Sequence, residues 1–435
     1  MNLTGSERRL LSNCARIEIP VELVGETKAL VQENSVRWPQ LIAASRHHGV
    51  ASLLYKNLER IGWDDAVPAS HRQTLFLYYQ RSTQHTLHLL KALVELLDRL
   101  SSAGLAVIVM KGPDLVYRVY GDPTLRGFRD LDFMVRSQDV DRAKAVLTSA
   151  GYRLAPSLHS ERLARRYHFN LPFEAEGDVP LRIDLHWELT DRFAGYTWDT
   201  QGIWDRSSAA GFSGQQARVL SLEDLITYLA VHIDVHGYLN QALAARGGIA
   251  HVLLHPYSEN RLIWFVDLYE ILRGSTARID WKTLVDRARE AGVGPALSTT
   301  LRLLNQVFMP LVDRPILDGL GLPRPSLGKR VLLSRLMIGI DRAEQTAERA
   351  ARWEALVALR HGVQFRLVRL LDLWGYIFPS LEQLVRRYRL GDSRWAATLH
   401  YPWHVVRALM SCIVWATELL FHFVRRATGA RSAQS

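Results

Sequence analysis

Two short segments in which aspartates and other polar residues alternate with apolar ones constrain the fold more than any other feature of the chain. One segment is 130–135, and the other is 181–187. Successive side chains of a strand point to opposite faces, so Asp130 and Asp132 share one face of the first strand. In the second strand, Asp184 shares a polar face with Arg182 and His186, opposite an apolar face. If the two strands are neighbours in one sheet, the three aspartates converge.

Three clustered carboxylates repel one another unless they are protonated or neutralised by cations. Magnesium takes oxygen ligands and also binds phosphates, so a site of this kind suits Mg²⁺. Two such ions can stabilise both the attacking oxygen and the leaving oxygen of a displacement at phosphorus. The alternative is that the aspartates simply face water or cap turns. His186 lies on the same strand face as Asp184, where it could orient a carboxylate or an acceptor molecule.

The chain resembles the uncharacterised nucleotidyltransferase family of bacteria, a branch of the DNA polymerase beta-like nucleotidyltransferase superfamily. The central matches are 110–112, 120–123 with Arg126, 130–135, 150–152 and 183–187. The flanking matches are helical segments at 38–50, 220–232 and 261–268. The superfamily's usual Gly-Gly or Gly-Ser turn is replaced here by Lys111 and Gly112, and Arg129 directly precedes the acidic pair, where a small or neutral residue is expected.

The resemblance implies Mg²⁺-dependent transfer of a nucleoside monophosphate from a nucleoside triphosphate such as ATP to an acceptor hydroxyl, with release of pyrophosphate. It implies that two Mg²⁺ ions are held by Asp130, Asp132 and Asp184. It also implies phosphate or nucleotide contacts from Lys111, Gly112, Arg126 and Arg129. Arg129 has the alternative role of pairing with a carboxylate. The rival hypothesis is a non-catalytic scaffold of the same fold that binds a nucleotide or a partner.

The fold class that these patterns predict is α+β, a small mixed β-sheet core with mainly helical regions on both sides. We predict an N-terminal helical region at 1–103, the catalytic core at 104–206, a helical substrate or lid region at 207–310, and a C-terminal helical region at 311–435. Apolar residues at helical spacing predict one long helix at 73–103, and further helices at 139–150, 222–235, 261–273, 280–291 and 295–308. Helices at 329–337 and 352–373 are also predicted.

Composition agrees with a folded protein that has an anionic partner. The 435 residues carry a net charge of +10, which fits nucleotides or an acidic membrane surface. No nucleic-acid-binding motif occurs, so we do not expect nucleic acid as a partner. The two cysteines, Cys14 and Cys412, do not suggest a disulfide framework, and no secretion signal precedes residue 20. We therefore predict a cytoplasmic protein.

Two further features leave alternatives open. The apolar stretch 404–424 contains charged residues, so we interpret it as a core helix, with an interfacial helix at the inner face of the membrane as the alternative. Such peripheral contact fits a polysaccharide or natural-product pathway. The pairs His232/His236 and His251/His255 have the four-residue spacing of helical zinc ligands. Packed helix histidines are the interpretation that we prefer.

Overall fold

The computed structural model describes most of the first three quarters of the chain and small parts of the rest. The described residues are 3–33, 35–63, 66–155, 161, 165, 169–175, 181–190, 196–236, 260–321, 378, 395, 398–407 and 409–410. The chain divides into two compact units. The first comprises 1–155, 169–192 and 196–324, and the second comprises 156–168, 193–195 and 325–435. The sheet and the helices described below belong to the first unit.

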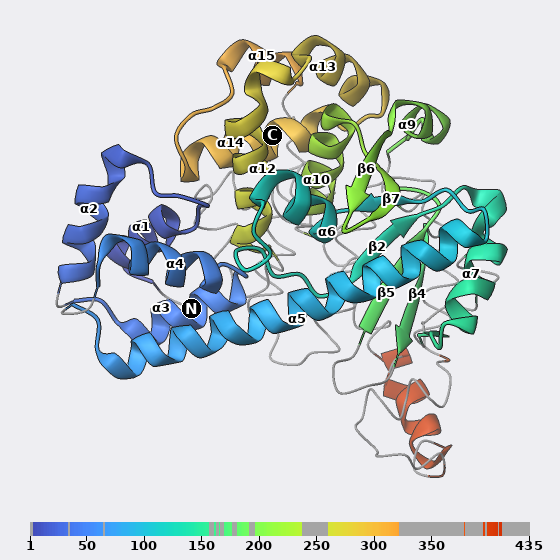
Figure 1. The fold of residues 1–435 in the computed structure, drawn as a ribbon, viewed down its shortest axis with the longest axis horizontal. Helices are drawn as coiled ribbons and strands as arrows, with labels where there is room; N and C mark the ends of the chain where they lie inside the picture. The colour runs from blue at the N-terminus through green and yellow to red at the C-terminus, as the bar shows by residue number, and fades with distance from the viewer. Residues whose placement is uncertain are drawn as a thin grey trace, which may run out of the picture. The chain divides into compact units, whose positions relative to one another are not determined.

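A seven-stranded mixed sheet forms the centre of the first unit (Figure 1). Its order is β3-β4-β5-β2-β1-β7-β6, with β2 paired to β5 in parallel and to β1 in antiparallel orientation. The strands are β1 (Ile108–Met110), β2 (Leu131–Met134), β3 (Arg153–Leu154), β4 (Asn170–Ala175), β5 (Leu181–His186), β6 (Ser208–Phe212) and β7 (Gln215–Val219). The two acidic segments of the sequence are therefore neighbouring strands, as the sequence predicts.

The alternation in β2 and β5 fixes which side chains enter the core. Leu131 and Phe133 on β2 and Ile183 and Leu185 on β5 are fully buried. Their burial holds the register that sets Asp132 opposite Asp184. A slip of one residue would move every apolar side chain to the wrong face, so the core determines where the aspartates meet.

Helices precede the sheet, connect its strands and follow it. Those before it are α1 (Gly5–Cys14), α2 (Val21–Gln32), α3 (Trp38–His47), α4 (Ala51–Ile61) and the long α5 (Ala69–Ser102). Figure 1 shows α5 running from α3 and α4 to the sheet, where it contacts β7 and α7. The connecting helices are α6 (Gly112–Leu115), η1 (Val116–Tyr120), η2 (Ser137–Asp139), α7 (Val140–Ser149) and α9 (Thr200–Arg206). The π-helical turn of η1 is a feature that the sequence patterns did not predict.

The helices after the sheet pack against one another around α10. They are α10 (Leu222–His236), α12 (Leu262–Ser275), η3 (Thr276–Arg278), α13 (Trp281–Glu290), α14 (Gly294–Val307) and α15 (Arg314–Gly319). The bounds of α10, α12, α13 and α14 agree with the predicted segments to within a few residues, whereas η3 and α15 lie where no helix was predicted. The predicted mixed sheet with helical flanks is confirmed.

Several predictions fall outside the described residues. They are the helices at 329–337 and 352–373, the pair His251/His255, and the part of 404–424 beyond Met410. None of the described helices is long and apolar enough to cross a membrane. Within the second unit, Trp395 and Leu399 are 78% and 71% exposed.

Glu7 of α1 is a buried carboxylate that ties α1 to α3, and we predict a measurable loss of stability when its charge is removed. Its oxygens accept hydrogen bonds from Arg37 Nη2 (2.7 Å), Arg37 Nε (2.9 Å), and the backbone N–H groups of Arg37 (2.9 Å) and Thr4 (2.7 Å). The Arg37 side chain is the main cause that lowers the pKa of Glu7 from 4.5 to about 2. Glu7→Gln leaves buried donors poorly satisfied, so the free energy of unfolding should fall by about 1–3 kcal/mol at neutral pH.

The direction of the pKa shift of Glu7 determines how the stability loss in Glu7→Gln depends on pH. A lowered folded-state pKa stabilises the protein above pH 4.5, and this contribution disappears as the pH falls from 4.5 towards 2. Urea denaturation should therefore show the gap between wild type and Glu7→Gln narrowing below pH 4.5. Exposed Glu22 on α2 gives the matched control, Glu22→Gln. A gap that stays constant down to pH 3, with no narrowing, would contradict the role of the Glu7 charge.

Candidate active site at the ends of the central strands

The sheet brings the predicted residues together on β1, β2 and β5. Lys111 directly follows β1, and Asp130 directly precedes β2. Asp132 lies between its two strand neighbours, opposite Met110 on β1 and Asp184 on β5. The convergence of Asp132 and Asp184 thus follows from parallel pairing in register.

Asp132 is the centre of the polar contacts. Its Oδ1 accepts a hydrogen bond from Lys111 Nζ at 3.0 Å and lies 2.9 Å from His186 Nε2. Asp132 is 2% exposed and His186 is 1% exposed. Burial by itself would raise the pKa of Asp132, but Lys111 and His186 outweigh it and hold the pKa below its ordinary value. Burial likewise opposes the charge of Lys111, whereas Asp132, Tyr228 and Asp130 raise the pKa of that ammonium. Both shifts favour the charged forms, the carboxylate of Asp132 and the ammonium of Lys111.

Crowding around Asp132 raises the pKa of each of the other two aspartates. Burial, and then the charge of Asp132, raise the pKa of Asp130 to about 6. The same two causes raise the pKa of Asp184. One lysine does not neutralise three carboxylates, so the site favours an additional cation or a bound proton.

One group of side chains in the described part of the chain has the geometry of a metal site. One ligand atom from each of Asp132, Asp184 and His186 lies within 4.8 Å of the other two. Carboxylate oxygens suit Mg²⁺ and Mn²⁺, and an imidazole nitrogen can join them for Mn²⁺. His186 Nδ1 is buried and has no hydrogen-bond partner among the described residues. The donor set therefore fits a divalent cation, and it places His186 closer to the carboxylates than the sequence indicated.

The turn between β1 and α6 has a strict requirement for glycine. A Cβ atom on Gly112 would lie 2.6 Å from Cγ of Phe128, in the loop before β2. Lys111 adopts a positive φ of 49°, which is uncommon for a residue with a side chain. The close approach of the two loops accounts for the glycine.

Comparison with known proteins decides the family. A family model described as uncharacterised nucleotidyltransferase matches residues 34–309, which include every site residue named above. The chain belongs to this nucleotidyltransferase family. No curated protein is similar enough to the chain to count as a match.

Two solved structures resemble parts of this nucleotidyltransferase. One is ANT(2″)-Ia in complex with adenylyl-2″-tobramycin, at 15% identity and a TM-score of 0.28, covering 46% of this chain and 95% of that one. The other is an antigenic nucleotidyltransferase-like protein from Paracoccidioides brasiliensis, at 14% identity and a TM-score of 0.30, covering 54% of this chain and 92% of that one. At these TM-scores the likeness carries no argument about the site.

The two predicted phosphate-binding arginines of the nucleotidyltransferase have different surroundings. Arg126 is buried and donates from Nε and Nη2 to the two oxygens of Asp267 on α12, each at 2.8 Å. Its Nη1 donates to the carbonyl of Gly127. Arg129 is exposed and makes no ion pair with the described residues, so its guanidinium is accessible to an anionic ligand.

Helix α10 adds Tyr228, a residue that sequence reasoning did not assign to the site. Tyr228 is buried, and the centroid of its ring lies 5.5 Å from Lys111 Nζ. One turn further along α10, the His232 ring lies 4.4 Å from that of His236 and 4.8 Å from that of Trp264. Burial, followed by Lys111 and His236, lowers the pKa of His232 well below its ordinary value. Residues 228, 232 and 236 have a four-residue spacing, and this was the available signal for a shared helix face.

Proposed function

We propose that the chain transfers a nucleoside monophosphate from a nucleoside triphosphate to an acceptor hydroxyl and releases pyrophosphate. The observation that carries this proposal is the pairing of Asp132 with Asp184 on adjacent parallel strands, with Asp130 two residues before Asp132. Membership of a nucleotidyltransferase family supports the reaction class. The helical regions around the core would select the acceptor.

Asp130, Asp132 and Asp184 would hold Mg²⁺, with two ions in the full complex, and His186 would orient Asp132 through the 2.9 Å contact. Bound there, the metal would supply charge neutralisation for the triphosphate and for the leaving pyrophosphate. His186 is a candidate ligand as well as a positioning residue, because its nitrogen belongs to the same close group.

The phosphates would meet Lys111, the backbone of Gly112 and Arg129. Lys111 combines a raised pKa with a side chain that is 20% exposed, so its charge can face a ligand while it contacts Asp132. In this proposal Arg126 does not contact the phosphates itself, because its N–H groups donate to Asp267 and Gly127. It would hold the loop that leads to Asp130.

Asp184 would take the proton of the acceptor hydroxyl. The hydroxyl oxygen forms a bond to the α-phosphorus, the bond from that phosphorus to the pyrophosphate oxygen breaks, and the proton passes to a carboxylate oxygen of Asp184. The direction of its pKa shift favours this role, because burial and Asp132 make the Asp184 carboxylate a stronger base than usual. Positioning and charge complementarity would supply most of the remaining rate.

A specific observation also supports the rival proposal of a non-catalytic, nucleotide-binding scaffold. The ammonium of Lys111 lies 3.0 Å from Asp132, so one cation already occupies a coordinating position on that carboxylate. In the scaffold, Lys111 would replace the metal, and nucleotide binding would not depend on Mg²⁺. A cytoplasmic location and peripheral membrane contact stay predictions under either proposal.

Calorimetry separates the two functions. Nucleoside triphosphates are titrated into the wild type with Mg²⁺ or with EDTA, and into the double variant Asp130→Asn/Asp132→Asn. Enzymatic function predicts binding that requires Mg²⁺ and that weakens at least about tenfold in the double variant. Exposed Asp98 and Asp205 provide a control that also loses two charges, Asp98→Asn/Asp205→Asn. Binding that is equally strong in EDTA would favour the scaffold, and absence of any binding would overturn both.

A further inference from the structure

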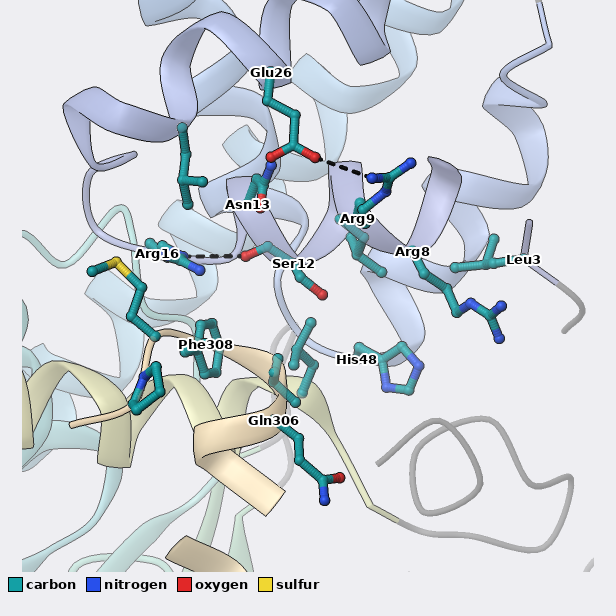
Figure 2. A pocket seen from close by; sticks show the side chains of 16 residues that line it. Leu3, Arg8, Arg9, Ser12, Asn13, Arg16, Glu26, His48, Gln306 and Phe308 are labelled. Carbon is teal, nitrogen blue, oxygen red and sulfur yellow. Dashed lines mark hydrogen bonds and ion pairs between the residues drawn. The ribbon is translucent and has the colours of Figure 1, made fainter. Parts of the chain in front are cut away.

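A cavity of about 500 Å³ lies in the amino-terminal part of the first unit, away from the acidic strands. Its walls come from α1, α2, the residue after α3, the start of α12, and the end of α14 with the segment that follows it. Apolar side chains such as Leu11, Leu262 and Phe308 supply much of the lining. In Figure 2, Arg16 and Phe308 lie at one end, Arg8 and His48 lie at the other, and Ser12 lies between them. None of the candidate active-site residues lines this cavity.

Arg16 is the unusual member of the lining. It is 2% exposed, yet it forms no ion pair with a carboxylate of the described residues. Its hydrogen bonds go to neutral acceptors, from Nη1 to the Tyr269 hydroxyl (3.3 Å) and from Nε to the Ser12 carbonyl (3.4 Å). The guanidinium also lies 5.1 Å and 5.0 Å from the ring centroids of Tyr269 and Phe308.

The nearby carboxylate, Glu270, is directed elsewhere. Its Oε1 accepts from the backbone N–H of Ile17 at 2.8 Å, and its Oε2 accepts from Arg273 Nε at 3.2 Å. Buried charges in proteins are normally paired with an opposite charge. A buried guanidinium that lines a cavity without such a pair is therefore suited to an anion that enters the cavity.

Two further side chains support a polar ligand. His48 is 2% exposed, and within the part of the chain that the structure describes its Nδ1 has no hydrogen-bond partner. Arg8 is exposed and forms no ion pair with the described residues. Its neighbour Arg9, by contrast, forms an ion pair in which Nη1 lies 3.4 Å from Oε1 of Glu26. The lining therefore carries a net positive charge, an unused hydrogen-bonding atom and apolar walls.

We propose that this cavity binds a small amphipathic anion, a molecule with one carboxylate or phosphate monoester group on an apolar body. The acid group meets the guanidinium of Arg16, and the apolar body lies against Leu11, Leu262 and Phe308. Arg8 attracts the anion to the opening. A cavity of this volume is in the range of sites for small molecules.

The test uses three probes with the same alkyl chain and the full-length protein. Octanoate, octyl phosphate and neutral octanamide are titrated by calorimetry into the wild type, Arg16→Met, Arg8→Ala and Lys28→Ala. Lys28→Ala is the matched control, because it removes an exposed positive charge of α2 that does not line the cavity. A fourth variant, Ser12→Phe, fills the cavity from α1 and leaves every arginine in place.

The expected result is that at least one anion binds to the wild type and that octanamide binds at least about tenfold more weakly. Arg16→Met and Ser12→Phe should each lower the affinity for the anion at least about tenfold, and Arg8→Ala should lower it a few fold. Lys28→Ala and Asp130→Asn/Asp132→Asn should bind as the wild type does. Preference for octanoate or for octyl phosphate identifies the acid group.

Three outcomes would overturn the proposal. They are equal affinity for octanamide, binding that survives both Arg8→Ala and Ser12→Phe, and absence of binding by either anion. Arg8 is exposed and Ser12 is half-buried, so these two variants keep the test decisive if Arg16→Met does not fold.

Discussion

Asp132→Asn is expected to lower the affinity of the protein for divalent cations at least about hundredfold. Asp132 accepts from Lys111, contacts His186 and faces Asp184 across the sheet, so it is the shared member of the polar contacts. Asparagine keeps the shape of the side chain but removes the charge that a cation needs. Mn²⁺ binding, followed by electron paramagnetic resonance, measures the metal directly and requires no knowledge of the acceptor.

Variants of Asp184 and His186 show how much each side chain contributes to the affinity for Mn²⁺. We expect Asp184→Asn to lose nearly as much Mn²⁺ affinity as Asp132→Asn. His186→Asn should lose about ten- to hundredfold if His186 only orients Asp132, and more if it coordinates the metal. Exposed Asp98 supplies the single-charge control, Asp98→Asn. If Asp132→Asn bound Mn²⁺ as well as Asp98→Asn, the acidic strands would not form a metal site.

The sequence predicted the part of this site that depends on strand geometry. Alternation with period two placed Asp130 with Asp132 and His186 with Asp184, and burial of Phe133 and Ile183 fixed the pairing of the strands. Alternation could not show that His186 would contact Asp132 on the neighbouring strand. That contact is diagonal, because His186 pairs with Met134 in the sheet and Asp132 pairs with Asp184. It therefore depends on the register of two segments that are far apart in the chain.

Contacts between distant segments account for the other features that the sequence did not give. The need for glycine at position 112 arises from Phe128, which approaches only when both loops are folded. Tyr228 reaches Lys111 from a helix that begins more than a hundred residues after the lysine. The partner of Arg126 is likewise separated from it by 141 residues. Charge and spacing identify an arginine near an acidic strand, but they do not reveal whether it faces a ligand or the protein.

The ion pair between Arg126 and Asp267 leads to the largest expected effect on stability. Asp267→Asn should lower the free energy of unfolding by about 3–5 kcal/mol, because it leaves the buried guanidinium of Arg126 without its opposite charge. The Arg126 and Asp267 side chains are 8% and 1% exposed, and their two hydrogen bonds are each 2.8 Å long. Tyr120→Phe removes only the hydroxyl that donates to Asp267 at 2.8 Å, and it should cost about 1 kcal/mol. Urea midpoints measured at one protein concentration compare the two variants with the wild type.

The same ion pair joins α12 to the segment that precedes Asp130, so its loss should also reach the site. We expect Asp267→Asn to weaken Mg²⁺-dependent nucleotide binding at a temperature where the variant is still folded, although Asp267 contacts no proposed ligand atom. The double variant Arg126→Met/Asp267→Leu replaces the pair by apolar side chains and should regain much of the stability, because no unpaired charge remains buried. If it regained nucleotide binding in full as well, Arg126 would act by holding the loop and not by contacting phosphate. If stability returned while nucleotide binding did not, the charge of Arg126 would itself be required by the ligand.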